Sequence, residues 1–216
     1  MHAFRELATA AYCPRKLYYR RRDPEDVEVP ERVRTCRELA FRYEELLADD
    51  PELMAAPIEV SPTEYRSRLG QLRAGLDAWP EVVDPEEREV LMEGRECRGV
   101  VHKVLGDPPR PSLVFAGEPP EQGVWEPQTV RLVAAAKALA WTRETEVETA
   151  VAEYPAYGVV REIPLTTRRK ATYRSALRTA ESIDGPPSRA TNRAKCGACE
   201  YQEDCGVTTR SMRSLL

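Results

Sequence analysis

Apolar residues recur at helical spacing in several stretches of this chain. Residues 31–48 are the clearest case, because their apolar positions fall on one side of a helix. Those positions are Val33, Cys36, Ala40, Tyr43 and Leu47. Ser61 and Pro62 supply an N-cap and a first-turn proline, which predicts a helix to about Leu76. Further helices are predicted over residues 127–143 and 168–183, and over residues 3–20, where Pro14 must kink the helix or start a new turn.

Shorter apolar runs bounded by glycine and proline predict the strands of a sheet. They cover residues 57–60, 98–105, 111–116, 147–154 and 157–165. The order of elements is helices, strands, helix, strands, helix and a cysteine-containing loop, which predicts an α/β fold in one domain, residues 1–216. Within it we expect a helical lobe over 1–95, a sheet core over 96–184, and a cysteine loop with a tail over 185–216.

Composition agrees with a packed core, because 42% of the residues are hydrophobic and 31% are charged. No apolar stretch approaches the roughly 20 residues that span a bilayer, and nothing resembles a signal peptide. We therefore expect a cytoplasmic protein without a membrane partner. The net charge of −4 gives no overall basic field, so any contact with nucleic acid must come from local patches.

Four cysteines form the most informative pattern in the sequence. Cys196, Cys199 and Cys205 follow the spacing C-x2-C-x5-C near the end of the chain, and Cys13 lies in the first predicted helix. Four thiolates can hold an iron–sulfur cluster, here 4Fe–4S, which would join the two ends of the chain. We therefore predict a cluster that acts as a structural staple.

Two other uses of these cysteines remain open. Four thiolates also bind zinc, although zinc ribbons usually pair two CxxC motifs and this chain has one. Six cysteines could form disulfides, but a reducing compartment is expected without a signal peptide. Cys36 and Cys97 lie in otherwise regular elements and are interpreted as small buried hydrophobic residues.

A basic run follows Cys13 in the sequence. It consists of Arg15, Lys16, Arg20, Arg21 and Arg22, with Tyr18 and Tyr19 between them. Guanidinium groups and aromatic rings in this pattern could hold a single DNA strand through phosphate contacts and stacking. The alternative is a solvated helix face whose cations pair with the many acidic residues.

The run Tyr12-Cys13-Pro14-Arg15-Lys16-Leu17-Tyr18-Tyr19, together with the C-terminal cysteine spacing, resembles the RecB-like nucleases that contain a C-terminal iron–sulfur cluster. The resemblance is to the CRISPR-associated exonuclease branch, which trims DNA before spacer integration. Arg98 and Gly99, which open the strand before the loop at 117–123, add to it, and residues 50–95 match least. The resemblance implies a restriction-endonuclease-like mixed sheet core. It also implies single-stranded DNA, DNA ends or a spacer-integration complex as partners.

Nucleases of this kind bind Mg or Mn with carboxylates from two adjacent strands, and a lysine lies two residues after the second carboxylate. The present chain differs at each position that the resemblance aligns. The first carboxylate corresponds to His102, and the Glu-x-Lys pair corresponds to Leu113 and Phe115. The resemblance further aligns a helical histidine with Ala40, and a glutamine and a tyrosine with Arg131 and Ala135.

These departures predict a degenerate nuclease site. Leu113 and Phe115 share a strand face, which would be apolar where the nucleases are charged. We interpret His102 as a core or pocket-lining residue, and a role as metal ligand is the less favoured alternative. Asp107, Glu118 and Glu126 are the acidic residues near enough in sequence to act as relocated ligands.

We therefore expect an iron–sulfur-binding, nuclease-inactive relative of these exonucleases that binds DNA ends or acts as an adaptor. One alternative is an active, metal-dependent single-stranded DNA exonuclease with relocated ligands. A second alternative is a protein–protein scaffold that does not bind DNA.

Overall fold

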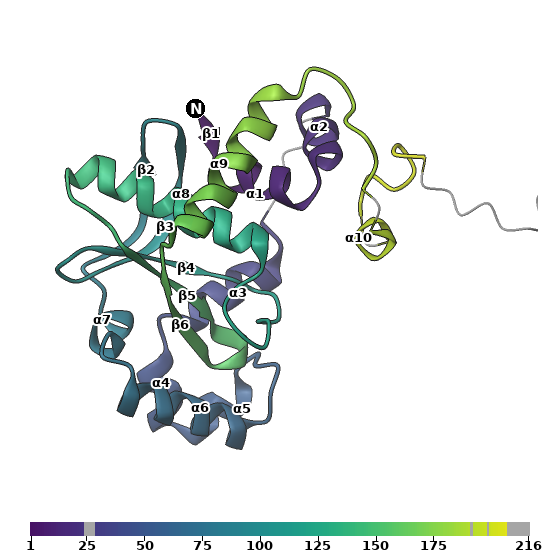
Figure 1. Cartoon of the computed structure of the whole chain (residues 1–216). Coiled ribbons are helices and arrows are strands. Elements are labelled where there is room, and N and C mark those ends of the chain that lie inside the picture. Colours follow the sequence, from purple (N-terminus) through teal and green to yellow (C-terminus); the bar gives the residue numbers. More distant parts are fainter. Residues whose placement is uncertain (24–28, 191, 198, 207–216) are drawn as a thin grey trace, which may run out of the picture.

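A computed structural model describes residues 1–23, 29–190, 192–197 and 199–206 of the chain (Figure 1). The strands are β1 (His2–Ala3), β2 (Glu87–Glu93), β3 (Cys97–Leu105), β4 (Arg110–Val114), β5 (Thr149–Tyr154) and β6 (Val159–Pro164). The N-terminal helices are α1 (Phe4–Tyr12), α2 (Pro14–Arg22), α3 (Glu31–Leu39), α4 (Tyr43–Ala48), α5 (Asp50–Ala55), α6 (Pro62–Gly75) and α7 (Trp79–Val83). The later helices are α8 (Glu126–Arg143), the 3-10 turn η1 (Pro155–Tyr157), α9 (Thr167–Ser182) and α10 (Arg193–Gly197).

Within the described residues, six strands form one mixed sheet. Strand β3 pairs antiparallel with both β2 and β4, and β1 pairs in parallel with the start of β3. Strand β5 is parallel to β4, and β6 is antiparallel to β5. Helix α8 provides the crossover that a parallel pair of strands requires. The chain is thus a mixed α/β protein.

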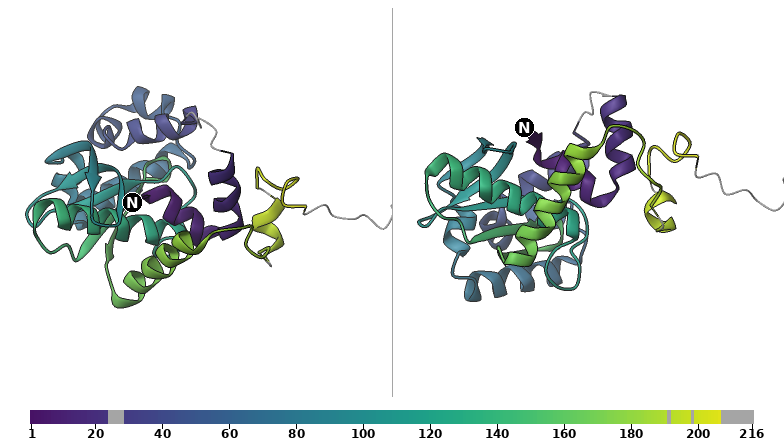
Figure 2. Two further views of the ribbon diagram at one scale, coloured as in Figure 1. Left: turned by 90° about the horizontal axis from the view of Figure 1, so that it is seen from above. Right: turned by 45° about the horizontal axis from the view of Figure 1, so that its top comes forward.

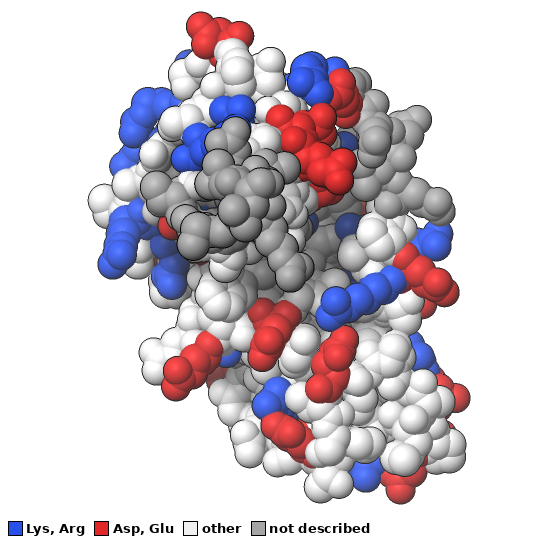
Figure 3. Space-filling model, turned by 90° about the vertical axis from the view of Figure 1, so that its right-hand side faces the viewer, with Lys and Arg blue, Asp and Glu red and all other residues white. Residues whose placement is uncertain are grey.

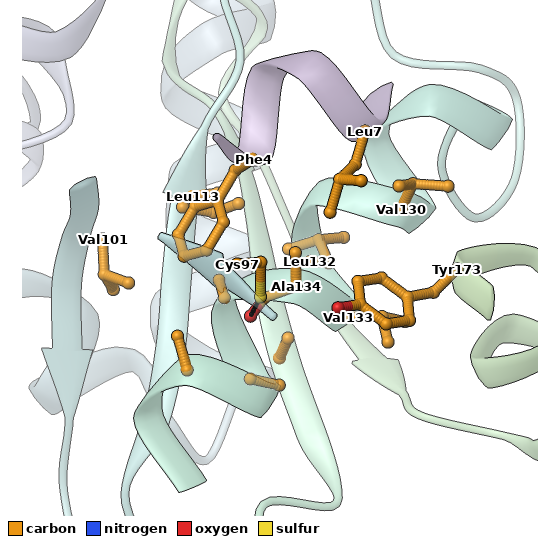
Figure 4. Packing of buried hydrophobic residues seen from close by; sticks show 14 of the residues in the cluster. Phe4, Leu7, Cys97, Val101, Leu113, Val130, Leu132, Val133, Ala134 and Tyr173 are labelled. Atoms are coloured by element: carbon orange, nitrogen blue, oxygen red, sulfur yellow. Dashed lines mark hydrogen bonds between the residues drawn. The ribbon is translucent and has the colours of Figure 1, made fainter. Parts of the chain in front are cut away.

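Helices α1, α8 and α9 pack against one another on one face of the sheet (Figures 1 and 2). Their apolar side chains meet the sheet in a core that includes Phe4, Leu113, Leu132 and Tyr173 (Figure 4). The alanine-rich face of α8 lets this helix lie close to the strands, and its residues Ala134, Ala135 and Ala136 are buried. This core joins the N-terminal and C-terminal parts of the sequence.

A close approach between α1 and β3 explains one glycine in this core. A Cβ atom on Gly99 would lie 2.3 Å from a ring carbon of Phe4. That distance is far inside van der Waals contact, so only glycine permits the ring to lie on the strand here. Gly99 therefore fixes how α1 packs across the sheet.

Helices α3 to α7 cover the other face of the sheet, where a second apolar core lies (Figure 1). Lys103 and Glu153 are fully buried beneath these helices, and their Nζ and Oε2 atoms are 2.8 Å apart. Lys103 also donates to the carbonyl oxygens of Ala40 and Val82, at 2.6 and 2.7 Å. Burial lowers the pKa of Lys103, and the nearby Glu153 carboxylate opposes that shift.

The buried carboxylate is itself saturated with donors. Tyr43 donates its hydroxyl to Glu153 Oε2 at 3.0 Å, and Ser112 donates to Oε1. Burial and the neighbouring carboxylate raise the pKa of Tyr43 well above its usual value. The network therefore connects β3, β4 and β5 with the helices of this face.

Most of the predicted elements are confirmed. The predicted helices 127–143 and 168–183, the helix opened by Ser61, and the four later strands correspond to α8, α9, α6, β3, β4, β5 and β6. Ser61 accepts a hydrogen bond from the backbone N–H of Glu64, as an N-cap does.

Two predictions about local structure are wrong, and two strands are not predicted. Residues 57–60 form no strand in the described structure, and Glu59 makes only an isolated backbone contact with Ala156. The predicted helix 31–48 divides into α3 and α4, because a tight turn at Ala40–Arg42 interrupts it. Strands β1 and β2, which both lie within residues 1–95, are absent from the elements that the sequence predicts.

The N-terminal helix breaks at Cys13, which is extended with φ −162° and ψ 111°, and Pro14 starts α2. None of the helices in the described part of the chain is long and apolar enough to cross a membrane.

The first prediction concerns the buried ion pair. Replacing Lys103 by Met should lower the free energy of unfolding by about 3–5 kcal/mol, because Glu153 would remain buried without its cation. The double variant Lys103→Met with Glu153→Gln should recover much of that loss. Urea unfolding measures both effects, and Lys137→Met, on the exposed side of α8, provides the control. An unchanged stability for Lys103→Met alone would contradict the role assigned to the pair.

Candidate functional site

The four cysteines of the predicted cluster line a single cavity. Cys13 reaches it from the break between α1 and α2, and Cys196 from α10. A turn follows, in which the N–H of Cys199 donates to the carbonyl of Cys196 and the N–H of Cys205 to that of Tyr201. All four are free, partly buried thiols. The fold thus brings together residues that are almost 200 positions apart in the sequence.

Cations surround this cavity. Arg15, Lys16 and Lys195 line it. The Nζ atom of Lys195 lies 4.9 Å from the centre of the Tyr12 ring and donates to the Tyr12 carbonyl at 3.2 Å. Burial and the neighbouring cysteines raise the pKa of Tyr12. Positive side chains therefore lie beside the four thiols.

The four cysteines are candidate metal ligands by their chemistry. Four thiolates are the donor set of an iron–sulfur cluster and also of a four-cysteine zinc site. In the described part of the chain, no three His, Cys, Asp or Glu side chains converge as the ligands of one metal ion do. The donor types of Cys13, Cys196, Cys199 and Cys205 fit such a group, and the cavity that these residues line is where it would be held.

The two remaining cysteines lie away from this cavity. Cys36 and Cys97 are buried, and burial raises the pKa of both thiols. The Cys97 Sγ donates weakly to the Ala134 carbonyl at 3.4 Å. The interpretation of both as small buried residues is confirmed.

The positions that the resemblance aligns with a nuclease site are occupied by core residues. Leu113 and Phe115 are 0% and 5% exposed and belong to the same core as α1 and α8. The Phe115 ring packs against Tyr154, with the ring centres 5.6 Å apart. These strand positions therefore contribute apolar packing.

His102 has a structural hydrogen bond. Its Nδ1 atom accepts from the backbone N–H of Val114 at 2.9 Å, so the ring replaces a backbone partner between β3 and β4. Because Nδ1 is the acceptor, the neutral ring has its proton on Nε2. Burial, with Arg131 and Arg37 nearby, lowers the pKa of His102 to about 3. His102 is therefore neutral at physiological pH.

The candidates for relocated carboxylate ligands are not brought together. Asp107 lies in the turn between β3 and β4, and Glu118 lies in the loop that follows β4. Glu126 begins α8 and lines a hollow that is separate from the cysteine cavity, together with Arg168 and Arg169.

A second, larger cavity lies between α1, α3, the end of β4 and the start of α8. Its volume is about 420 Å³. Its lining includes five cations, which are Arg5, Lys16, Arg20, Arg37 and Arg131, and no described acidic side chain. We call this space the cationic pocket. Phe115 forms part of its wall, so it adjoins the strand position that the resemblance aligns with the nuclease lysine.

Sequence reasoning assigned no function to Arg5 or Arg37. For Arg131 the sequence gave one signal. The resemblance aligns it with a glutamine of the nucleases, and Arg131 is a charged residue among the apolar residues of α8. Arg37 gave no such signal, because it lies on α3 among several other charged residues.

The basic run on α2 is extensively paired. Lys16 and Arg20 both contact Glu200, at 2.6 and 3.1 Å. Arg21 contacts Glu6 and donates to the Ala180 carbonyl at 2.6 Å. Arg22 forms an ion pair with Asp23, and Arg15 donates to the carbonyl of Pro187. Acidic and basic side chains are interspersed on the face of the molecule that includes α2 and α10 (Figure 3).

Comparison with protein-family models and with curated proteins finds no match for this chain.

The second prediction uses the neutral His102. The folded pKa of this histidine is about 3, below the ordinary value of 6.5, so its contribution to stability is complete above pH 6.5. As the pH falls from 6.5 towards 3, the unfolded chain binds a proton that the folded chain does not, and stability decreases. The variant His102→Gln should reduce this slope of unfolding free energy against pH by up to about one proton.

Chemical denaturation at several pH values measures the slope. The variant His2→Gln is the matched control, because it removes the other histidine and leaves the His102 contribution in place. An identical slope for His102→Gln and the wild type would refute the assignment.

Proposed function

We propose that this protein is an iron–sulfur-binding, nuclease-inactive relative of the CRISPR-associated exonucleases that binds DNA ends, in a spacer-integration complex or as an adaptor in the cytoplasm. The observation that carries the proposal is the replacement of the aligned catalytic positions. Leu113 and Phe115 are buried in the core, and His102 is held by a backbone hydrogen bond. Beside them lies a pocket lined by cations, which suits phosphate and not a divalent metal.

The strand arrangement supports a restriction-endonuclease-like core. The chemistry implied by the resemblance requires two adjacent strands, followed by a helix that contributes further side chains. Strands β3 and β4 are adjacent and antiparallel, and α8 follows them in sequence and borders the same pocket.

The cysteine cavity supports the cluster. Bound there, an iron–sulfur cluster would supply cross-links from α2 to the C-terminal loop. The chain's own contacts already bring these parts together, since Tyr19 donates to the Asp204 carbonyl at 3.0 Å and stacks on Tyr201. Tyr12 and Lys16 line both the cysteine cavity and the cationic pocket. The staple would therefore hold one wall of the site that we assign to DNA.

The third prediction tests the cluster. Anaerobically purified wild-type protein should be brown and contain iron and sulfide, whereas Cys13→Ser should lose visible absorption and melt at a lower temperature. The control is Cys36→Ser, a cysteine outside the cavity, which should retain the colour. Colourless wild-type protein with stoichiometric zinc would contradict the cluster.

The fourth prediction tests DNA binding without cleavage. The protein should bind labelled single-stranded DNA, and the logarithm of its affinity should fall linearly with the logarithm of salt concentration. The same DNA should stay intact in the presence of Mn, because no carboxylate pair lies beside β3 and β4 in the described lining of the pocket.

Two results would overturn this function. Binding that is absent at low salt would favour the protein–protein scaffold. Cleavage that requires Mn and disappears in an Asp107, Glu118 and Glu126 triple-alanine variant would establish an active nuclease with relocated ligands.

A further inference from the structure

Two arginines of the cationic pocket have no hydrogen-bond or ion-pair partner among the described residues. The Nε atoms of Arg37 and Arg131 are buried without a hydrogen bond, as are those of Arg15, Arg66 and Arg110. The last three use their terminal nitrogens to bind carbonyl or carboxylate oxygens. In the part of the chain that the structure describes, no hydrogen bond or ion pair is found for the side chains of Arg37 and Arg131.

Arg131 is held in a position where its charge is poorly solvated. Its guanidinium carbon lies 5.2 Å from the centre of the Phe115 ring, which fixes the orientation of the group. Burial, together with the nearby positive charge of Arg37, lowers the pKa of Arg131 to about 10. Two like charges are therefore close together in a partly buried place.

The rest of the pocket adds positive charge. Lys16 and Arg20 share one carboxylate, that of Glu200, and Arg5 contributes a fifth cation. Partly buried charges without a protein counter-ion are less well solvated than exposed ones, which destabilises the fold. An anion bound in the pocket would offset that cost, so the arginines point to an anionic ligand.

We propose that the cationic pocket binds the terminal phosphate of a DNA strand, an inference that rests on the DNA-end binding proposed above. Two guanidinium groups without counter-ions match a phosphomonoester, which has a charge of about −1.5 to −2 at neutral pH. A phosphodiester within a strand has a single charge. Planar guanidinium groups are also the side chains best suited to binding phosphate oxygens in pairs.

The size of the pocket agrees with a terminal nucleotide. A volume of about 420 Å³ falls in the range of roughly 300–1,000 Å³ that small-ligand pockets span. Tyr12 and Phe115 provide aromatic surface at its wall. The site would thus hold a strand end beside Phe115, the position that the resemblance aligns with the nuclease lysine.

The test compares three single-stranded DNA probes of one sequence, which carry a 5′-phosphate, a 3′-phosphate or hydroxyl groups at both ends. Fluorescence anisotropy is measured on the full, anaerobically purified chain, with chelator and at constant ionic strength. One phosphorylated probe should bind at least about tenfold more tightly than the hydroxyl probe, as expected for a charged hydrogen-bonded contact. Inorganic phosphate should compete for the difference.

The decisive variant is Arg131→Gln, and Arg143→Gln, at the exposed end of the same helix, is its control. Arg131→Gln should abolish the preference for the phosphorylated end and should melt at the same temperature as the wild type or higher, because it removes an unpaired charge. A merely structural arginine would lower the melting temperature instead. Arg143→Gln should keep the preference.

The outcomes separate this inference from the proposed function. Equal binding of all three probes would overturn the terminal-phosphate site and leave DNA binding in place. Binding of none of the probes would overturn the proposed function. In that case, stabilisation of the wild type by inorganic phosphate, absent in Arg131→Gln, would support the phosphate site, and its absence from both proteins would overturn that site too.

Discussion

The buried pair of Lys103 and Glu153 is the constraint on which the rest of this structure depends. Neither side chain has any exposed surface, and each is satisfied only by partners from several elements. The pair requires β3, β4 and β5 to be in register and requires the helices beyond them to be in place. A charged pair is not needed for stability as such, but once it is buried, every partner must be positioned correctly.

The same pair determines which way the neighbouring residues point. Side chains alternate along a strand, so the placement of Ser112 and Glu153 towards α3–α7 directs Leu113, Phe115 and Tyr154 towards α1 and α8. Lys103 also donates to the carbonyl of Ala40 at the end of α3, three residues after Arg37. The polar network thereby helps to position both the aromatic wall of the pocket and the helix that carries Arg37.

The sequence was informative where one local signal decided the structure. Ser61 and Pro62 opened a helix as predicted, and the alanine-rich helix and the four later strands followed from their periodicity. It was uninformative where tertiary contacts decided. The turn at Ala40–Arg42 interrupts an unbroken helical pattern, and its carbonyl is used by a lysine 63 residues away. Strand β2 consists of three charged residues, three apolar residues and a glutamate, so it lacks the alternation that predicts a strand, and it becomes a strand only by pairing with β3.

The candidate site also has one part that the sequence predicts and one part that it does not. The cysteine spacing predicted which thiols would share a cavity, because ligand chemistry leaves a pattern in the sequence. The cationic pocket left no pattern, since Arg5, Arg37 and Arg131 come from three separate helices. An arginine becomes conspicuous only when its surroundings lack a carboxylate, and that is a property of the packed structure.

The two cavities together explain why the ends of the chain would need to be joined. Tyr12 and Lys16 separate the cysteine cavity from the cationic pocket and face both. Helix α2 is short, strongly basic and follows a break at Cys13, so its own propensity holds it weakly in position. A cluster anchored at Cys13 would restrain the start of this helix and hence Lys16. A structural cofactor at one end of the molecule would in this way preorganise a phosphate site that contributes no ligand to the cofactor itself.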